Sequence, residues 1–281
     1  MNKNVFTFIG CDCEYDEAKI VLFGAPFDST TSFRPGTRFA SSAIRSESFG
    51  IETFSPYQDK DLLDYKVFDS GDLELPFGNP EQALCDIEDT TRVILADGKI
   101  PFMIGGEHLV TLGEFRAVAE KYPDVHIIHF DAHCDLRDDY LGVKLSHACV
   151  LRRCHDIVGD GRIFQFGIRS GDRDEFEFAK THTYLHRFDL ETLDETVAKL
   201  KGKPVYFTLD LDVLDPSEFC GTGTPEAGGV SFKELHKAIM TLSELNIVGL
   251  DMNELSPVYD PSGRSTALAC KLLREILLAM L

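Results

Sequence analysis

Six short runs of β-branched and aromatic residues constrain the fold of this 281-residue chain more than any other feature. Each run is almost continuously apolar, which is typical of parallel strands that are covered on both faces. Segments with helical periodicity lie between the runs, and strands alternating with helices at this pace predict βαβ crossovers and a mostly parallel sheet. The expected strands are 19–24, 99–105, 125–130, 161–168, 204–209 and 246–250, and the expected helices are 79–98, 108–123, 231–245 and a terminal helix ending at 281.

The composition excludes several classes of partner. Lys and Arg number 28 against 47 Asp and Glu, so the formal charge is −19. Nucleic acids and anionic lipid surfaces require clustered positive charge, so we expect neither as a partner and expect a cationic guest instead. No apolar stretch approaches the roughly 18 residues of a membrane span, so no membrane segment is expected. Eight cysteines without a CxxC pair indicate reduced thiols and a cytoplasmic protein. With no repeat or linker, we expect a single domain over 1–281.

Acidic residues and histidines directly follow four of the expected strands. The sequences are GGEH (105–108), DAHCD (131–135), DLD (210–212) and DMNE (251–254). The carboxyl ends of parallel strands share one edge of the sheet, where α/β proteins bind ligands. A single acid at a strand end is usually a helix cap. Four such clusters at corresponding ends predict a metal site.

DAHCD is the most informative of the four sequences. If it continues its strand, alternation places Asp131, His133 and Asp135 on one face and Cys134 on the other. The two aspartates of DLD are likewise two residues apart. We therefore expect these side chains to converge with the histidine of GGEH.

The predicted metal ligands are two imidazoles and four carboxylates without a thiolate. They are His108, Asp131, His133, Asp135, Asp210 and Asp212. Such a donor set suits Mn²⁺, and less specifically Co²⁺, Zn²⁺ or Mg²⁺. Six ligands are too many for one ion that must keep an open position, so two ions with bridging carboxylates are expected. Two ions can hold a hydroxide nucleophile at neutral pH, which predicts metal-assisted hydrolysis.

At these residues the sequence resembles the ureohydrolases, the arginase and agmatinase family. The resemblance runs from GAPFDSTTSFRPGTRFASSAIR (24–45) to the last helix, and is strongest in GGEH, DAHCD and FTLDLDVLDPSEFCGTGTPEAGG (207–229). It implies a three-layer α/β/α fold with a central, mostly parallel eight-stranded sheet. It also implies assembly as a homo-trimer or homo-hexamer.

The resemblance divides the ligands between two Mn²⁺ ions. His108, Asp131, Asp135 and Asp210 would hold one ion, and His133, Asp131, Asp210 and Asp212 the other. The implied chemistry is attack of the bridging hydroxide on a guanidinium carbon, which releases urea and an amine. Asp135 falls where the family passes a proton to the leaving amine.

Two further residues match the family pattern. Glu254 falls where a carboxylate binds the guanidinium, whose planar set of N–H donors pairs well with such a group. His147 falls where a histidine assists substrate binding or proton transfer. From the sequence alone, His147 is an ordinary polar residue at a helix start, and only the resemblance gives it a role.

The substrate prediction depends on residues 136–147. Arginase-like relatives recognise the amino-acid end of arginine with Asn and Ser in this stretch, which here contains no Asn. Asp138 and Asp139 suit an amine better than a carboxylate, so we expect agmatine to be hydrolysed to putrescine and urea. Guanidinobutyrate, arginine and formiminoglutamate remain open, as does a non-catalytic relative. A one-zinc site of the histone-deacetylase kind is disfavoured because GGEH and DLD are both intact.

Overall fold

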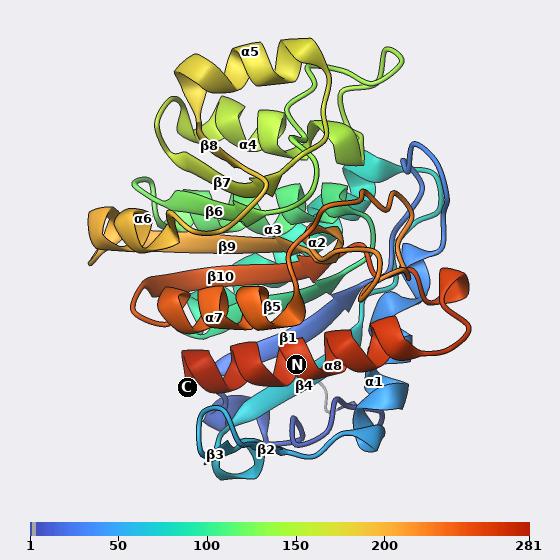
Figure 1. Ribbon diagram of the computed structural model, residues 1–281. Coiled ribbons are helices and arrows are strands. Elements are labelled where there is room, and N and C mark those ends of the chain that lie inside the picture. Colours follow the sequence, from blue (N-terminus) through green and yellow to red (C-terminus); the bar gives the residue numbers. More distant parts are fainter. Residues whose placement is uncertain (2–3) are drawn as a thin grey trace.

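The computed structural model describes Met1 and residues 4–281, and its centre is an eight-stranded sheet (Figure 1). The strand order is β4-β1-β5-β10-β9-β6-β7-β8, and every neighbouring pair is parallel. The strands are β1 (Ile20–Ala25), β4 (Val67–Asp72), β5 (Ile100–Gly105), β6 (His126–Phe130), β7 (Ile163–Ile168), β8 (Tyr184–Arg187), β9 (Pro204–Asp210) and β10 (Asn246–Asn253). A small antiparallel pair, β2 (Phe54–Ser55) and β3 (Lys60–Asp61), lies apart from this sheet.

Helices cover both faces of the sheet, which confirms the three-layer α/β/α prediction (Figure 1). One layer contains α1 (Ala40–Glu47), α6 (Leu193–Leu200), α7 (Phe232–Leu242) and α8 (Arg264–Met280), and the other contains α2 (Pro80–Ala96), α3 (Thr111–Lys121), α4 (Val150–Val158) and α5 (Arg173–His182). Each layer has its own cluster of buried apolar side chains against the sheet. Among the described residues, no helix combines the length and apolarity that crossing a membrane would require.

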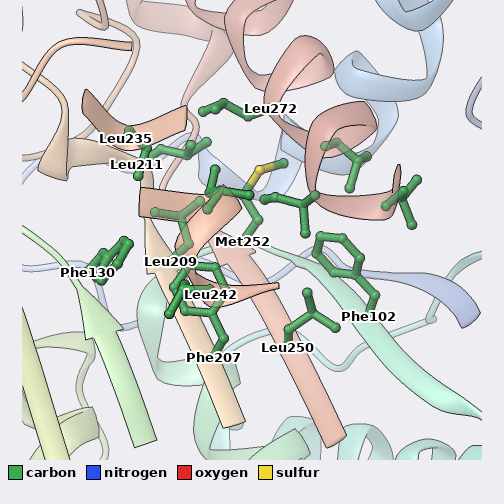
Figure 2. Packing of buried hydrophobic residues seen from close by; sticks show 14 of the residues in the cluster. Phe102, Phe130, Phe207, Leu209, Leu211, Leu235, Leu242, Leu250, Met252 and Leu272 are labelled. Atoms are coloured by element: carbon green, nitrogen blue, oxygen red, sulfur yellow. The ribbon is translucent and has the colours of Figure 1, made fainter. Parts of the chain in front are cut away.

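Alternation along the central strands divides their side chains between the two layers. Phe207 and Leu209 of β9 pack with Leu250 of β10 under α7 and α8 (Figure 2). Tyr206, which directly precedes Phe207, packs on the opposite face with Phe115 of α3. Thr208 therefore also faces the α3 side, where it is fully buried.

Two of the eight strands, β4 and β8, were not expected from the sequence. Both lie at the edges of the sheet. The sequence of β4 contains Asp69 and Asp72, and β8 is only partly buried. An edge strand is not covered like a central one, so neither segment has the continuous apolar run on which the prediction relied. The six expected strands are confirmed to within one or two residues at most ends, although β10 continues to Asn253.

The strand order brings the four acidic sequences together. β6 follows β5 in the sequence, but in the sheet β10 and β9 lie between these two strands. The four adjacent central strands β5, β10, β9 and β6 therefore end within or directly before GGEH, DMNE, DLD and DAHCD, respectively. Their carboxyl ends share one edge, toward which the β1 and β10 arrowheads point in Figure 1.

Candidate metal centre

The DAHCD segment does not continue its strand, so the expected alternation is wrong. β6 ends at Phe130, and Asp135 has a left-handed backbone with φ 53°. Similarly, β9 ends at Asp210 and a 3₁₀ turn carries Asp212. Here side-chain direction is set by turns rather than by the strand pleat. The turns nevertheless bring the expected side chains together.

His108 is the centre of the first group of ligand atoms. It begins a 3₁₀ turn after β5 and is fully buried. Its Nδ1 lies 3.1 Å from Asp131 Oδ2, 3.1 Å from Asp135 Oδ2 and 3.4 Å from Asp210 Oδ2. One imidazole nitrogen therefore faces three carboxylates.

His133 is the centre of the second group. Its Nδ1 lies 3.0 Å from Asp212 Oδ2 and 3.4 Å from Asp131 Oδ1. Asp131 thus directs one oxygen toward His108 and the other toward His133, as expected of a carboxylate shared by two ions. The structure brings all six predicted ligands into one cluster.

The electrostatics of this cluster favour bound cations. Burial raises the pKa of Asp210, and the charges of Asp212 and Asp131 raise it further. Among the described residues, no Lys or Arg forms an ion pair with any of the four aspartates. Among the residues that the structure describes, the buried Nδ1 of His108 also has no hydrogen-bond partner. Crowded carboxylates with two imidazoles and no thiolate fit two divalent cations.

Glu254 and His147 lie beside the first group. Glu254 Oε1 accepts a hydrogen bond from His108 N–H at 2.7 Å and lies 3.2 Å from His147 Nδ1. Burial lowers the pKa of His147, but the hydrogen bond and charge of Glu254 and the charge of Asp135 outweigh it and raise the pKa to about 9. The neutral ring accepts from Ser32 N–H at Nε2 (2.9 Å), whereas the imidazolium can donate to the Ser32 hydroxyl (2.8 Å). His147 is therefore a buried member of the site rather than an ordinary helix-start residue.

A cavity of about 250 Å³ opens onto this cluster. Its lining includes His133, Asp135, His147 and Asp210, with Asp172 and Glu175 also lining it. Burial raises the pKa of Glu175 to about 7. No sequence motif singled out Asp172 or Glu175, which form a capping box at the start of α5.

Asp138, predicted to bind the substrate tail, does not line this cavity. Its side chain is 58% exposed and accepts a hydrogen bond from Arg153 at 2.9 Å. It lines a neighbouring hollow with Asp139. The turns after DAHCD therefore direct Asp138 and Asp139 away from the cavity.

The sequence also gave no signal for Arg169, which holds the loops that carry the ligands. Its guanidinium donates to the carbonyl oxygen of Asp212 at 2.7 Å and to that of Glu226 at 2.8 Å. It also reaches the carbonyls of Gly167, Val213 and Leu214. One cation therefore joins the end of β7 to the DLD turn and to the GTGTPE loop.

His129 orients the shared carboxylate. Its Nε2 lies 2.8 Å from Asp131 Oδ2, while Gln165 Nε2 donates to its Nδ1 at 3.1 Å. This arrangement places the ring proton on Nε2, facing Asp131. No sequence motif assigned His129 a role beside the predicted ligands.

Comparisons with known proteins show which proteins this chain resembles. The family model described as "Arginase family" matches residues 18–279. The agmatinase of Bacillus subtilis (strain 168) is 48% identical over 275 residues, covering 96% of this chain and 95% of the relative. The guanidinobutyrase of Pseudomonas aeruginosa is 32% identical, covering 94% of this chain and 87% of that protein. A crystal structure of a candidate agmatinase from Clostridium difficile is 54% identical, with a TM-score of 0.93 and coverage of 95% and 98%.

The chain therefore belongs to the arginase family. Within that family it is an amidinohydrolase, an enzyme that hydrolyses a carbon–nitrogen bond of an amidine group.

Proposed function

We propose that this enzyme hydrolyses agmatine to putrescine and urea, using two Mn²⁺ ions. The observation that carries the proposal is the convergence of two imidazoles and four carboxylates, of which His133, Asp135 and Asp210 line an acidic cavity. The first ion is assigned to His108, Asp131, Asp135 and Asp210, and the second to His133, Asp131, Asp210 and Asp212. When bound, such ions supply Lewis acidity that lowers the pKa of water toward neutrality.

Glu254 is assigned to binding the guanidinium. Its Oε1 is held by His108 N–H and faces His147. An ionised carboxylate only accepts hydrogen bonds, and a guanidinium only donates them. Glu254 can therefore orient the amidine carbon over the ligand cluster.

Asp135 and His147 are assigned to proton transfer and substrate positioning. Both line the cavity, and Asp135 Oδ2 lies within 3.1 Å of His108 Nδ1. A carboxylate at this position can hold the proton of the attacking water and deliver it to the departing amine. His147 can donate from either ring nitrogen when it is charged.

The acids at the cavity wall support a cationic substrate tail. Asp172 and Glu175 line the cavity together with one arginine, Arg137. Arg137 lies 3.1 Å from Asp172 and 3.4 Å from Glu175, so its charge is already paired. The agmatinase relative at 48% identity supports the same choice.

A carboxylate-tailed substrate is the second candidate, because Arg137 could bind it and a guanidinobutyrase is among the relatives. The deciding experiment loads the protein with Mn²⁺ and offers agmatine, guanidinobutyrate, arginine and formiminoglutamate, with urea or formamide as the readout. Agmatine turnover well above the other three is expected. A higher specificity constant for guanidinobutyrate or arginine would refute the agmatine proposal.

The assembly and the metal are parts of the same proposal. We expect a homo-trimer or homo-hexamer, which light scattering coupled to size exclusion would measure directly. We expect Mn²⁺ to restore more activity to chelated protein than Co²⁺, Zn²⁺ or Mg²⁺, because oxygen donors outnumber imidazoles in the ligand set.

A further inference from the structure

A chain of buried hydrogen bonds lies behind the first ligand group. His108 Nε2 lies 2.9 Å from Thr208 Oγ1, and Thr208 Oγ1 donates to Asp251 Oδ1 at 2.6 Å. His108 and Thr208 are fully buried and Asp251 is 1% exposed. Asp251 is the first residue of DMNE, and the proposed reaction does not use it.

The direction of each bond follows from the donors around Asp251. Its Oδ2 accepts from the Tyr206 hydroxyl, and its Oδ1 accepts from Asn253 Nδ2 at 2.5 Å as well as from Thr208. Donors thus engage both oxygens, so Asp251 acts as an acceptor throughout. The single hydroxyl hydrogen of Thr208 is therefore directed to Asp251.

This direction determines the tautomer of His108. With its hydrogen committed to Asp251, Thr208 Oγ1 offers His108 only a lone pair. Nε2 of His108 must then carry a ring proton, so Nδ1 is the nitrogen that can offer a lone pair to a cation. That Nδ1 faces Asp131, Asp135 and Asp210.

We propose that Thr208 and Asp251 are positioning residues that fix the ring orientation and tautomer of His108, so that Nδ1 is available to the first cation. The inference rests on the proposed function only in requiring a cation at that site. Metal-ligating histidines generally donate their second N–H to an oriented acceptor. Here the acceptor is the Thr208 hydroxyl, and Asp251 on the neighbouring strand fixes the orientation of that hydroxyl.

Loss of the Thr208 hydroxyl has a specific consequence. Valine has nearly the shape of threonine but cannot accept a hydrogen bond. In the Thr208→Val variant, His108 Nε2–H would have no acceptor, so the other tautomer becomes favourable. Its Nδ1–H would donate to Asp131 or Asp135 and occupy the lone pair that the cation needs.

The test compares Thr208→Val with Thr208→Ser, which keeps the hydroxyl. Thr91→Val is the matched control, because Thr91 is a fully buried threonine of α2 whose hydroxyl donates only to the Ile87 carbonyl. Mn²⁺ bound per chain is measured by equilibrium dialysis. The affinity of one of the two ions should fall by about 10- to 100-fold in Thr208→Val, and Thr208→Ser and Thr91→Val should bind like wild type.

A second measurement reads the tautomer without activity. At a concentration of diamagnetic Zn²⁺ that saturates wild type, NMR of protein with ¹⁵N-labelled histidine should show the His108 proton on Nε2 in wild type and on Nδ1 in Thr208→Val. If Thr208→Val does not fold, Asp251→Asn serves instead, because an amide at 251 can reverse the Thr208 hydrogen bond. Its expected shifts in affinity and tautomer have the same direction.

The outcomes separate the two proposals. Wild-type affinity and an unchanged tautomer in Thr208→Val would overturn the role of Thr208 and Asp251. If wild type binds two ions but prefers a substrate other than agmatine, only the substrate proposal fails and the positioning role stands. A wild-type chain that binds no divalent ion would overturn both.

Discussion

His147 Nδ1 lies 3.2 Å from Glu254 Oε1, and that same oxygen accepts the backbone N–H of His108 at 2.7 Å. One carboxylate oxygen therefore connects the histidine of the cavity wall to the turn that carries a metal ligand. The side chain of Glu254, which is proposed to orient the substrate, is thus fixed in position relative to the proposed metal site. Changes at Glu254 should affect the alignment of substrate more than the binding of metal.

Replacement of Glu254 by Gln tests this separation. The glutamine keeps an oxygen for His108 N–H but loses the charge that pairs with a guanidinium. We expect kcat/KM for agmatine to fall by about 100-fold or more, as for loss of one buried charge-assisted pair. Bound Mn²⁺ should stay at the wild-type number, as metal analysis would show, and loss of an ion would contradict the assignment.

The raised pKa of His147 predicts a pH-dependent stability. The folded pKa is about 9 and the ordinary value is 6.5, so the ionised ring stabilises the fold fully below pH 6.5. This stabilisation, of up to about 3 kcal/mol, is lost as the pH rises through 9. His147→Asn lacks it, so the free energy of unfolding of wild type and variant should differ most at pH 6 and converge near pH 9.5. Urea denaturation in chelator would measure both, and a constant difference across that range would contradict the raised pKa.

Asp210→Asn should change stability in opposite directions with and without metal. Burial and the charges of Asp212 and Asp131 raise the pKa of Asp210, so its ionised form destabilises metal-free protein at neutral pH. In chelator, the variant should unfold at higher temperature than wild type. In excess Mn²⁺ the order should reverse, because binding at about 100 times Kd stabilises wild type by about 2.7 kcal/mol per ion. The same order in both solutions would argue against a metal role for Asp210.

Asp172 and Asp138 make a matched pair for the substrate tail. Asp172 lines the cavity, whereas Asp138 is paired with Arg153 outside it. Asp172→Asn should raise KM for agmatine by about tenfold, the equivalent of about 1.4 kcal/mol, and Asp138→Asn should change it much less. Asp172→Asn should also favour guanidinobutyrate relative to agmatine, because it removes one of the acids paired with Arg137. A larger effect at Asp138 would restore the prediction made from sequence.

The sequence predicted the central strands because burial on both faces imposes continuous apolar runs, as in the strand ending at Phe130. The edge strands had no such run. The convergence of the acidic side chains was predicted because only a shared sheet edge accounts for so many acids at strand ends, although turns, not alternation, direct Asp131 and Asp135 toward His108. Arg169 could not be predicted, since its partners are backbone carbonyls from separate loops and no side-chain pattern encodes them.

Asp135 and Glu254 both have left-handed backbones, with φ of 53° and 66°. Non-glycine residues adopt this conformation at a cost of about 1–3 kcal/mol each, which glycine largely avoids. The chain therefore folds with local strain at two positions whose side chains are assigned to the proposed reaction. In a library of variants selected only for heat resistance, glycine should become enriched at 135 and 254, and the survivors should be inactive. Selection for turnover should remove the same variants, so thermal stability and catalytic activity impose opposite requirements on these two positions.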